Sequence, residues 1–313
     1  MKELAEKVLA GDHRSIARLI TFAENDAPEA AEIMKEIHFA SGKAHVIGVT
    51  GVMGAGKSSL IAEMAIEYRK RGKTVGIIAI DPTSPFSGGA LLGDRIRMTE
   101  VSTDRGIFIR SMGTRGMLGG LTVAVYDVVE ILDAAGFDII IVETVGVGQA
   151  EVDIIKIADT TLVVLVPGLG DSIQTFKAGL MEIADVYAIN KADRPGIDMI
   201  MAEIQNLVEM THVEGERRIP VLPVSAKKRE GIGGIIQEID RHWECLESTN
   251  SFREHRRSRY EAELVEIIKK RLMNLIFDEE VFRKKVDGLI DQIMRKETAP
   301  YTAAEEILSK VLK

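Results

Sequence analysis

The sequence contains one cysteine, Cys245, and no apolar run that approaches the length of a membrane-spanning helix. A single cysteine excludes an internal disulfide and is typical of proteins kept in a reducing compartment. A transmembrane helix needs about 18 or more apolar residues in a row, and residues 1–15 carry charges every few positions without an apolar signal core. We therefore expect a cytoplasmic protein that has no membrane partner.

An excess of positive charge is also missing. The 40 lysine and arginine residues are outnumbered by 48 aspartate and glutamate residues, which gives a formal net charge of −8 at pH 7. Non-specific binding to nucleic acid depends on attraction to phosphates, so this balance argues against a nucleic-acid partner. The 313 residues, 46% of them hydrophobic and 28% charged, are typical of a globular protein with one large or two modest domains.

Short runs rich in β-branched residues begin at residue 45 and are separated by helical stretches such as 60–71 and 199–210. The runs are HVIGVT, TVGIIAI, GIFIRS, DIIIVET, TLVVLVP, VYAIN and VLPVSA. Several are apolar at consecutive positions, which is typical of strands buried on both faces of a parallel sheet. The pattern predicts an α/β fold, with a doubly wound, mostly parallel sheet, over residues 43–248.

Helical extensions flank the predicted sheet domain. Residues 1–42 place apolar side chains at helical spacing and are expected to form an N-terminal helical extension. Residues 249–313 lack any strand pattern and instead show three apolar stripes at helical spacing. These stripes exceed what a lone helical hairpin can bury, so we expect this region to pack on the sheet domain or on a second copy of the chain.

The stretch GVTGVMGAGKSS, residues 48–59, follows the first predicted strand and precedes a helix. Its spacing of glycine, lysine and serine matches the Walker A pattern in the required context. The glycines allow backbone N–H groups to surround phosphates, the lysine neutralises the terminal phosphates, and the first serine hydroxyl binds magnesium. The predicted nucleotide contacts in this loop are Gly51, Met53, Gly54, Ala55, Gly56, Lys57, Ser58 and Ser59.

Two further motifs indicate which base is bound. The tetrapeptide NKAD, residues 190–193, ends the strand-like run VYAIN, and SAKK follows VLPV. A carboxylate at Asp193 can accept hydrogen bonds from two guanine donors that adenine does not offer, and such a site rejects the analogue strongly. We therefore expect GTP and GDP as ligands, with base contacts from Asn190, Lys191, Asp193, Ser225, Ala226 and Lys227.

Three carboxylates fall near the ends of the strands around this loop. Asp81 ends TVGIIAI, Asp94 follows in LLGDRIRM, and Glu143 stands at the Walker B position of FDIIIVET. One bound cation explains the three better than three separate loop caps do. We expect Mg²⁺ to be held by Ser58, Asp81, Asp94 and Glu143, and no other tightly bound metal cofactor. Lys57, Asp81 and Glu143 are then the expected catalytic residues of a GTPase whose intrinsic rate is slow.

The order of the longer motifs resembles the MeaB/ArgK family of P-loop GTPases. The resemblance rests on IDPTSPFSGGALLGDRIRM, FIRSMGTRGMLGGL, IIIVETVGVGQAEVDI and INKAD, and it extends from GDHRSIARLITFAEN to APYTAAEEIL. It implies a chaperone of an adenosylcobalamin-dependent acyl-CoA mutase, in this family methylmalonyl-CoA mutase. GTP hydrolysis by the chaperone would gate cofactor loading, protection and reactivation of that mutase. The resemblance also implies a homodimer formed through the C-terminal helices, and coupling to the mutase through Asp171, Gln174 and Lys177.

Two other functions compete with this interpretation. A metallochaperone GTPase that inserts nickel or zinc would need clustered cysteine and histidine ligands. Here the six histidines are scattered, and His242 with Cys245 forms a single pair at helical spacing that is typical of packing. An ATPase or kinase associated with amino-acid transport is the third hypothesis, and the NKAD motif argues against its preference for adenine.

Overall fold

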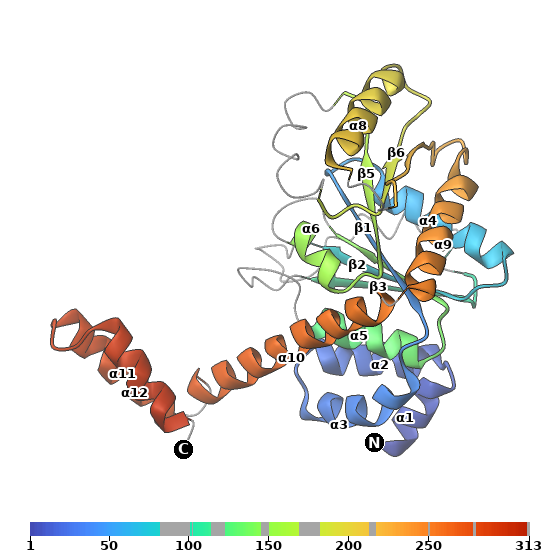
Figure 1. The fold of residues 1–313 in the computed structure, drawn as a ribbon. Coiled ribbons are helices and arrows are strands. Elements are labelled where there is room, and N and C mark those ends of the chain that lie inside the picture. The colour runs from blue at the N-terminus through green and yellow to red at the C-terminus, as the bar shows by residue number, and fades with distance from the viewer. Residues whose placement is uncertain are drawn as a thin grey trace. The chain divides into compact units, whose positions relative to one another are not determined.

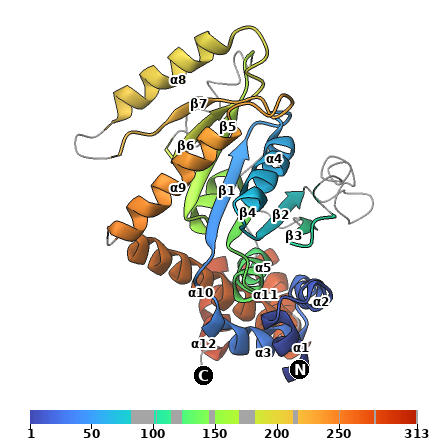
Figure 2. The same ribbon diagram turned by 90° about the vertical axis from the view of Figure 1, so that its right-hand side faces the viewer.

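The computed structural model describes residues 1–81, 101, 103–113, 123–144, 150–168, 182–212, 217–249, 251–277 and 280–311. Seven strands in these ranges form one parallel sheet in the order β3-β2-β4-β1-β5-β6-β7 (Figures 1 and 2). The strands are β1 (His45–Gly51), β2 (Val75–Asp81), β3 (Ile107–Gly113), β4 (Ile139–Glu143), β5 (Thr160–Leu165), β6 (Val186–Ile189) and β7 (Val221–Pro223).

The order of the strands identifies the edge at which a ligand would bind. Strands β2, β3 and β4 lie on one side of β1, and β5, β6 and β7 lie on the other. In doubly wound folds, ligands bind beyond the carboxyl ends of the strands where the strand order reverses. The carboxyl end of β1, at Gly51, is therefore the expected position of a site.

Helices cover both faces of the sheet, which explains the consecutive apolar residues of its central strands. One face packs against α4 (Lys57–Lys70) and α9 (Ile232–Ser248), and the other packs against α5 (Val123–Ala134) and α8 (Ile197–Thr211). Neighbouring residues of β1 alternate between the two cores, with Val46 on the α5 side and Ile47 on the α4 side. The predicted α/β doubly wound fold is confirmed.

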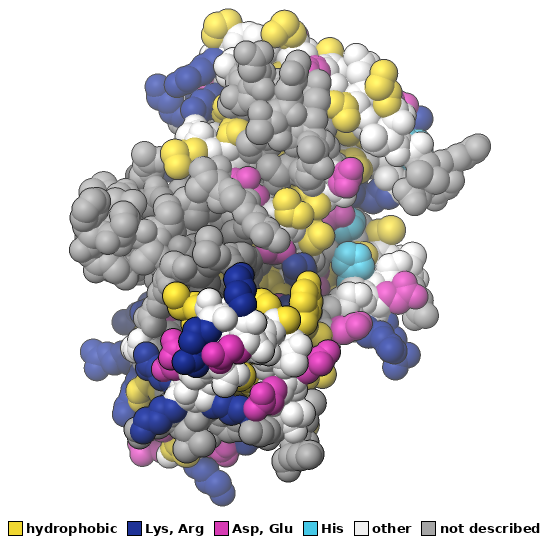
Figure 3. Space-filling model, turned by 90° about the vertical axis from the view of Figure 1, so that its left-hand side faces the viewer, with side chains coloured by type: hydrophobic (Ala, Val, Ile, Leu, Met, Phe, Trp, Pro, Cys, Tyr) yellow, Lys and Arg dark blue, Asp and Glu magenta, His cyan; other side chains and the backbone are white. Residues whose placement is uncertain are grey.

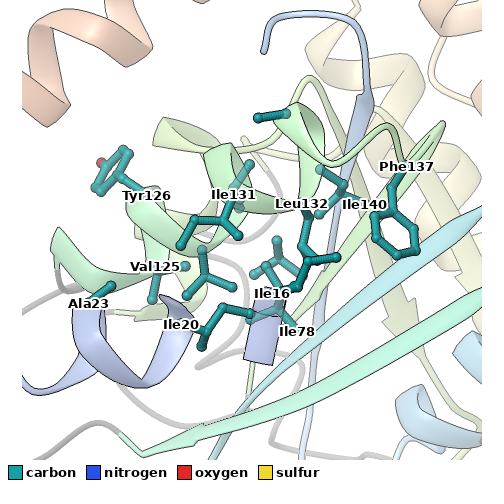
Figure 4. Close-up of a cluster of buried hydrophobic side chains, with 14 of the residues drawn as sticks. Ile16, Ile20, Ala23, Ile78, Val125, Tyr126, Ile131, Leu132, Phe137 and Ile140 are labelled. Atoms are coloured by element: carbon teal, nitrogen blue, oxygen red, sulfur yellow. The ribbon is translucent and has the colours of Figure 1, made fainter. Parts of the chain in front are cut away.

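The N-terminal helices α1 (Lys2–Leu9), α2 (His13–Glu24) and α3 (Pro28–Ile37) share a core with α5. Ile16 and Ile20 of α2 lie against Ile131 and Leu132 of α5 (Figure 4). The connection to β1, which contains the short helix η1 (His38–Ala40), is fixed by Asp133, whose carboxylate accepts the backbone N–H groups of residues 42, 43 and 44 at 2.7–3.0 Å. Burial and hydrogen bonding together attach residues 1–42 to the sheet.

The C-terminal region is helical, as the sequence predicts. It contains α10 (Ser251–Phe277), α11 (Glu280–Met294) and α12 (Pro300–Val311). The chain divides into two compact units, residues 1–258 and 259–313. In the second unit α11 packs against α12 around Val286, Leu289 and Ala303, while Leu264 and Ile268 remain 58% and 55% exposed. The boundaries 1–42, 43–248 and 249–313 stay a prediction.

The surface carries charges of both signs. On the face drawn in Figure 3, described basic and acidic side chains lie next to one another. Within the ranges given above, none of the helices is long and apolar enough to cross a membrane.

Candidate nucleotide-binding site

The glycine-rich loop connects the end of β1 to the first turn of α4, and two of its glycines are required by their surroundings. Gly51 has a φ of 140°, and a Cβ there would lie 2.1 Å from the carbonyl oxygen of Val164 on β5. Gly56 has a φ of 85°, and a Cβ there would lie 2.6 Å from the side-chain amide of Asn190. The loop can therefore keep this shape only with glycine at both positions.

Lys57 is buried at the start of α4 and reaches back over the loop. Its Nζ donates hydrogen bonds to the carbonyl oxygens of Gly51, at 2.7 Å, and Val52, at 3.3 Å. Only 5% of the residue is exposed. The ammonium group is thereby fixed beside backbone N–H groups of the loop and the N-terminal end of a helix, where an anion is favoured.

Ser58 and Glu143 meet beside this lysine although 85 residues separate them. The Ser58 hydroxyl donates to Glu143 Oε1 at 2.8 Å, and both residues are buried. Glu143 ends β4 opposite Val49 of β1, and the next residue, Thr144, donates its backbone N–H to the carbonyl of Val49 at 3.1 Å. Hydroxyl and carboxylate oxygens are the donors that Mg²⁺ takes in phosphate-binding sites, so this pair fits the predicted metal.

The other predicted metal ligands are only partly described. Asp81 ends β2 and pairs through its backbone with Gly113 of β3, but its side chain and the whole of Asp94 lie outside the described residues. Among the residues that the structure describes, no three histidine, cysteine, aspartate or glutamate side chains gather as metal ligands. Magnesium binding at all four predicted positions stays a prediction.

Asn190 joins three loops at the carboxyl edge of the sheet. Its side-chain Nδ2 donates to the carbonyl of Ala55 in the glycine-rich loop at 2.7 Å. Its Oδ1 accepts the backbone N–H groups of Lys191, at 2.8 Å, and of Ala226 in the SAKK loop, at 3.2 Å. One buried amide therefore fixes the phosphate loop and both predicted base loops to one another.

Lys191 and Asp193 complete these connections. Lys191 adopts a left-handed φ of 62° and donates its Nζ to the carbonyl of Gly54 at 2.7 Å. The Ser225 hydroxyl donates to Asp193 Oδ1 at 2.8 Å, and this hydrogen bond holds the pKa of the Asp193 carboxyl below its usual range. Asp193 is therefore a carboxylate at neutral pH, the form that accepts two hydrogen bonds from guanine.

The structure places the remaining predicted residues as follows. Ser59 lies on the first turn of α4, Met53 is exposed in the loop, and Lys227 follows Ala226 in the exposed part of SAKK. Asp171, Gln174 and Lys177 fall outside the described residues, so their predicted role in coupling is not examined by the structure.

Glu151 is a residue of this region that the sequence did not indicate. It lies on α6 (Ala150–Asp153), is buried, and is within the electrostatic field of the Lys57 ammonium group. The sequence shows only a carboxylate eight positions after Glu143, in a stretch with no recognised motif at that spacing.

The pair of possible metal ligands in α9 does not form a site in the described ranges. His242 is buried, and its Nδ1 shares a hydrogen bond of 2.9 Å with the Thr160 hydroxyl. Cys245, on the same helix, is exposed. The two side chains therefore lie in different environments.

Comparisons with known proteins agree with the geometry. The family model described as methylmalonyl-CoA mutase-associated GTPase MeaB matches residues 16–281. A putative GTPase of Pyrococcus abyssi is 47% identical over 313 residues, which cover 99% of this chain and 96% of that protein. A fused isobutyryl-CoA mutase of Geobacillus kaustophilus is 34% identical over 229 residues, which cover 70% of this chain and 21% of that protein.

A solved structure shares the fold. The crystal structure of an LAO/AO transport system kinase superposes with a TM-score of 0.73 at 22% identity, covering 100% of this chain and 97% of the other. The family match spans more than half of the chain, and it coincides with the phosphate loop and the base loops described above. The chain therefore belongs to the MeaB family of methylmalonyl-CoA mutase-associated GTPases, and it hydrolyses GTP.

Proposed function

We propose that this chain is a cytoplasmic chaperone that uses GTP hydrolysis to gate cofactor loading, protection and reactivation of an adenosylcobalamin-dependent acyl-CoA mutase. The family description names an association with methylmalonyl-CoA mutase. A relative in which a homologous segment forms part of an isobutyryl-CoA mutase supports the same class of partner. Methylmalonyl-CoA mutase is the member of that class that we propose first.

The single observation that carries the nucleotide part of the proposal is the position of Asn190. Its amide holds Ala55 of the phosphate loop and Ala226 of the base loop at 2.7 and 3.2 Å. A nucleotide that reaches from one loop to the other would contact both ends of this bridge. We propose that Asp193 selects guanine there, and that Lys57 and the loop backbone bind the β- and γ-phosphates.

We propose that magnesium binds at the Ser58–Glu143 pair, together with Asp81 and Asp94. When bound, the ion would supply positive charge to the phosphates as the bond to the γ-phosphate breaks. The chain's own contribution is positional, because Ser58 is fixed by the first turn of α4 and Glu143 by the end of β4.

The strand that precedes the proposed coupling segment, β5, ends beside the start of the phosphate loop, where Val164 pairs with Gly51. Val166, Pro167 and Gly168 follow the strand, and Gly168 has a left-handed φ of 87° that turns the chain. We propose that Asp171, Gln174 and Lys177, further along the chain, transmit the nucleotide state to the mutase, and that a homodimer forms through the C-terminal helices.

The experiment is a GTPase assay with and without purified adenosylcobalamin-dependent mutases, among them methylmalonyl-CoA and isobutyryl-CoA mutases. We expect one of them to raise the slow intrinsic rate about tenfold or more, which corresponds to an activation barrier lowered by about 1.4 kcal/mol. Lys177→Ala should keep its affinity for GDP within a few fold and lose most of the stimulation. The chaperone proposal fails if none of the mutases changes the GTPase rate or binds the chain.

The metallochaperone hypothesis is tested with the same protein. A chain that inserts nickel or zinc should bind one of these ions with micromolar affinity or better, and GTP should change that affinity. The separate environments of His242 and Cys245 argue against a metal site formed by these two residues. An ATPase linked to transport would instead bind ADP at least as tightly as GDP.

A further inference from the structure

Glu151 is a buried carboxylate that the proposed nucleotide contacts do not use. It is 7% exposed, and no described residue places a hydrogen-bond donor on its Oε1. A buried carboxylate without such a donor is costly, because it loses hydration without a replacement. Its retention in the interior therefore calls for an explanation.

Other buried carboxylates of the fold have hydrogen-bond or ion-pair partners. Asp153, two residues further along the same short helix, pairs with Lys156 at 2.6 Å. Asp133 accepts three backbone N–H groups, and Asp159 accepts the backbone N–H of Val46 at 2.9 Å. Each of these acids has a structural role, whereas Glu151 Oε1 has no hydrogen-bond donor among the residues that the structure describes.

Tight packing fixes where Glu151 stands. The turn η2 (Ile154–Lys156) continues α6 and lies against β1. A Cβ on Gly48 of β1 would be 2.5 Å from Ile154 Cγ1 and 2.9 Å from Ala158 Cβ. Gly48 is three residues before Gly51, where the phosphate loop begins. Ile154 is fully buried and three residues after Glu151, so its packing against β1 fixes the position of the short helix that carries Glu151.

The charged group that acts on the Glu151 carboxyl is the ammonium group of the phosphate-binding lysine, Lys57. Burial raises the pKa of the Glu151 carboxyl, and the Lys57 ammonium acts in the opposite direction. Among the described residues, Lys57 is the charged group whose field acts on this acid. A carboxylate with a raised pKa beside the phosphate-binding group has the properties of a general base.

We propose that Glu151 orients the water that attacks the γ-phosphate of GTP and accepts a proton from it. The inference rests on the proposed nucleotide site and assigns a role there that no other described residue fills. The water oxygen forms a bond to the γ-phosphorus, and the bond from that phosphorus to the bridging oxygen breaks, its electron pair staying on GDP. One water proton passes to Glu151 Oε1 and then to the released phosphate, so the carboxylate is regenerated.

The test compares Glu151→Gln with the full-length parent in single-turnover GTP hydrolysis. The substitution keeps size and hydrogen-bonding capacity but removes the base, so we expect the hydrolysis rate to fall about 100-fold or more, within the range of general-base contributions. Affinities for GDP and for a non-hydrolysable GTP analogue should stay within about threefold. The hydrolysis rate of the parent should fall at acidic pH as the base is protonated. This acidic limb of the pH–rate profile should disappear in the variant.

Asp153→Asn is the matched control, because it removes a buried acid from the same helix that is already paired with a lysine. It should keep the parent's acidic limb. If Glu151→Gln does not fold, as judged by loss of GDP binding, Glu151→Asp replaces it. That variant keeps the base but withdraws it by one methylene, so it should retain the limb and lose about tenfold or more in rate.

Three outcomes overturn the inference. They are a Glu151→Gln rate within about threefold of the parent, an acidic limb that survives in that variant, and a Glu151→Asp rate equal to the parent's. Tighter nucleotide binding by Glu151→Gln with an unchanged rate would show instead that the acid only balances the charge of Lys57. A parent that neither binds GDP nor hydrolyses GTP would contradict the nucleotide site itself, which is a separate result.

Discussion

Asp193 is the side chain on which the choice of guanine depends. Ser225 holds its carboxylate in position at 2.8 Å. We predict that the parent binds GDP at least about 100-fold more tightly than ADP, a difference of about 2.7 kcal/mol, and that Asp193→Asn loses a comparable factor for GDP. Isothermal titration calorimetry measures both affinities. Ser225→Ala is the milder comparison, with an expected loss of about tenfold, and similar affinities of the parent for ADP and GDP would contradict the prediction.

A set of hydrogen-bonded polar side chains, buried at His45, Thr160 and His242 and half-buried at Asp185, lies at the opposite end of the strands. His45 Nε2 and His242 Nδ1 both contact the Thr160 hydroxyl, at 2.8 and 2.9 Å, and His242 Nε2 lies 3.3 Å from Asp185. Burial lowers the pKa of His45 to about 3 and of His242 to about 4, while burial raises the pKa of Asp185 to about 6. All three groups are therefore disfavoured in their charged forms.

This set of residues should make folding stability depend on pH. Burial, and then the charges of Arg217 and His255, lower the folded-state pKa of His242 from its ordinary 6.5 to about 4. The favourable contribution of neutral His242 to the free energy of unfolding is therefore complete above pH 6.5 and is lost as the pH falls toward about 4. Protonation of Asp185 between about pH 6 and 3.8 acts in the opposite direction and offsets part of the loss.

We predict that His242→Gln, which cannot be protonated, reduces this acid sensitivity. The decrease in the free energy of unfolding between pH 7.5 and pH 5 should be smaller in the variant than in the parent by about 1–2 kcal/mol. Denaturant unfolding at the two pH values measures it. An identical decrease in both proteins would show that His242 keeps its ordinary pKa in the fold.

Residues whose role depends on neighbours in the sequence can be identified from the sequence. Residues whose role depends on contacts with distant parts of the chain mostly cannot. The order of Gly51, Gly56, Lys57 and Ser58 is visible because one short loop contains them. The amide of Asn190 contacts Ala55, which is 135 residues away, and Glu151 becomes notable only when burial and Lys57 are known. Contacts of that kind depend on how the sheet is assembled, and no local spacing encodes them.

Among the elements, the strands were the most predictable. Seven β-branched runs correspond to seven strands in the described ranges, because burial on both faces selects consecutive apolar residues. Strand ends differ by a few residues, since a strand stops where its neighbour stops. The four-residue helix α6 was not predicted, because so short a helix has no periodicity to detect and is held in place by η2 against β1.

The contact of β1 with η2 can be tested through Gly48. A methyl group there would lie 2.5 Å from Ile154 Cγ1, so we predict that Gly48→Ala destabilises the fold by about 1–3 kcal/mol, as overpacking of a core does. Thermal or denaturant unfolding measures the change. Gly234→Ala is the control, because no atom lies within 4 Å of the added Cβ on α9 and alanine favours helix there by up to about 1 kcal/mol. Equal stability of Gly48→Ala and the parent would mean that η2 can move away.

At the scale of the whole molecule, the short second unit carries several exposed apolar side chains. Residues such as Leu264 and Ile268 are more than half exposed. We predict that the intact chain is a dimer at micromolar concentration, and that a chain ending at Ser258 is a monomer that still binds GDP. Light scattering together with a GDP titration tests both statements. A monomeric intact chain would remove the basis for the proposed dimer.

The position of the truncation matters, because the start of α10 belongs to the first unit. Arg256 donates its Nη2 to the carbonyl of Ala44 at 2.9 Å, and the ring of Phe252 lies edge-on to Trp243 at 5.0 Å. A chain that ends at residue 251 loses both contacts and leaves a buried carbonyl without its donor. We expect it to be less stable than the chain ending at Ser258, by about 1–3 kcal/mol.

The core shared by α2 and α5 has a practical meaning for protein engineering and for gene fusion. Met1 is 63% exposed, so an affinity tag or a joined enzyme can be attached ahead of it without entering the core. Removing the first 42 residues to isolate a minimal catalytic module would instead uncover side chains of α5 such as Ile131, which is fully buried and lies against α2 (Figure 4). That surface is apolar and continuous, so a shortened module would aggregate unless a joined partner supplied a new cover for it.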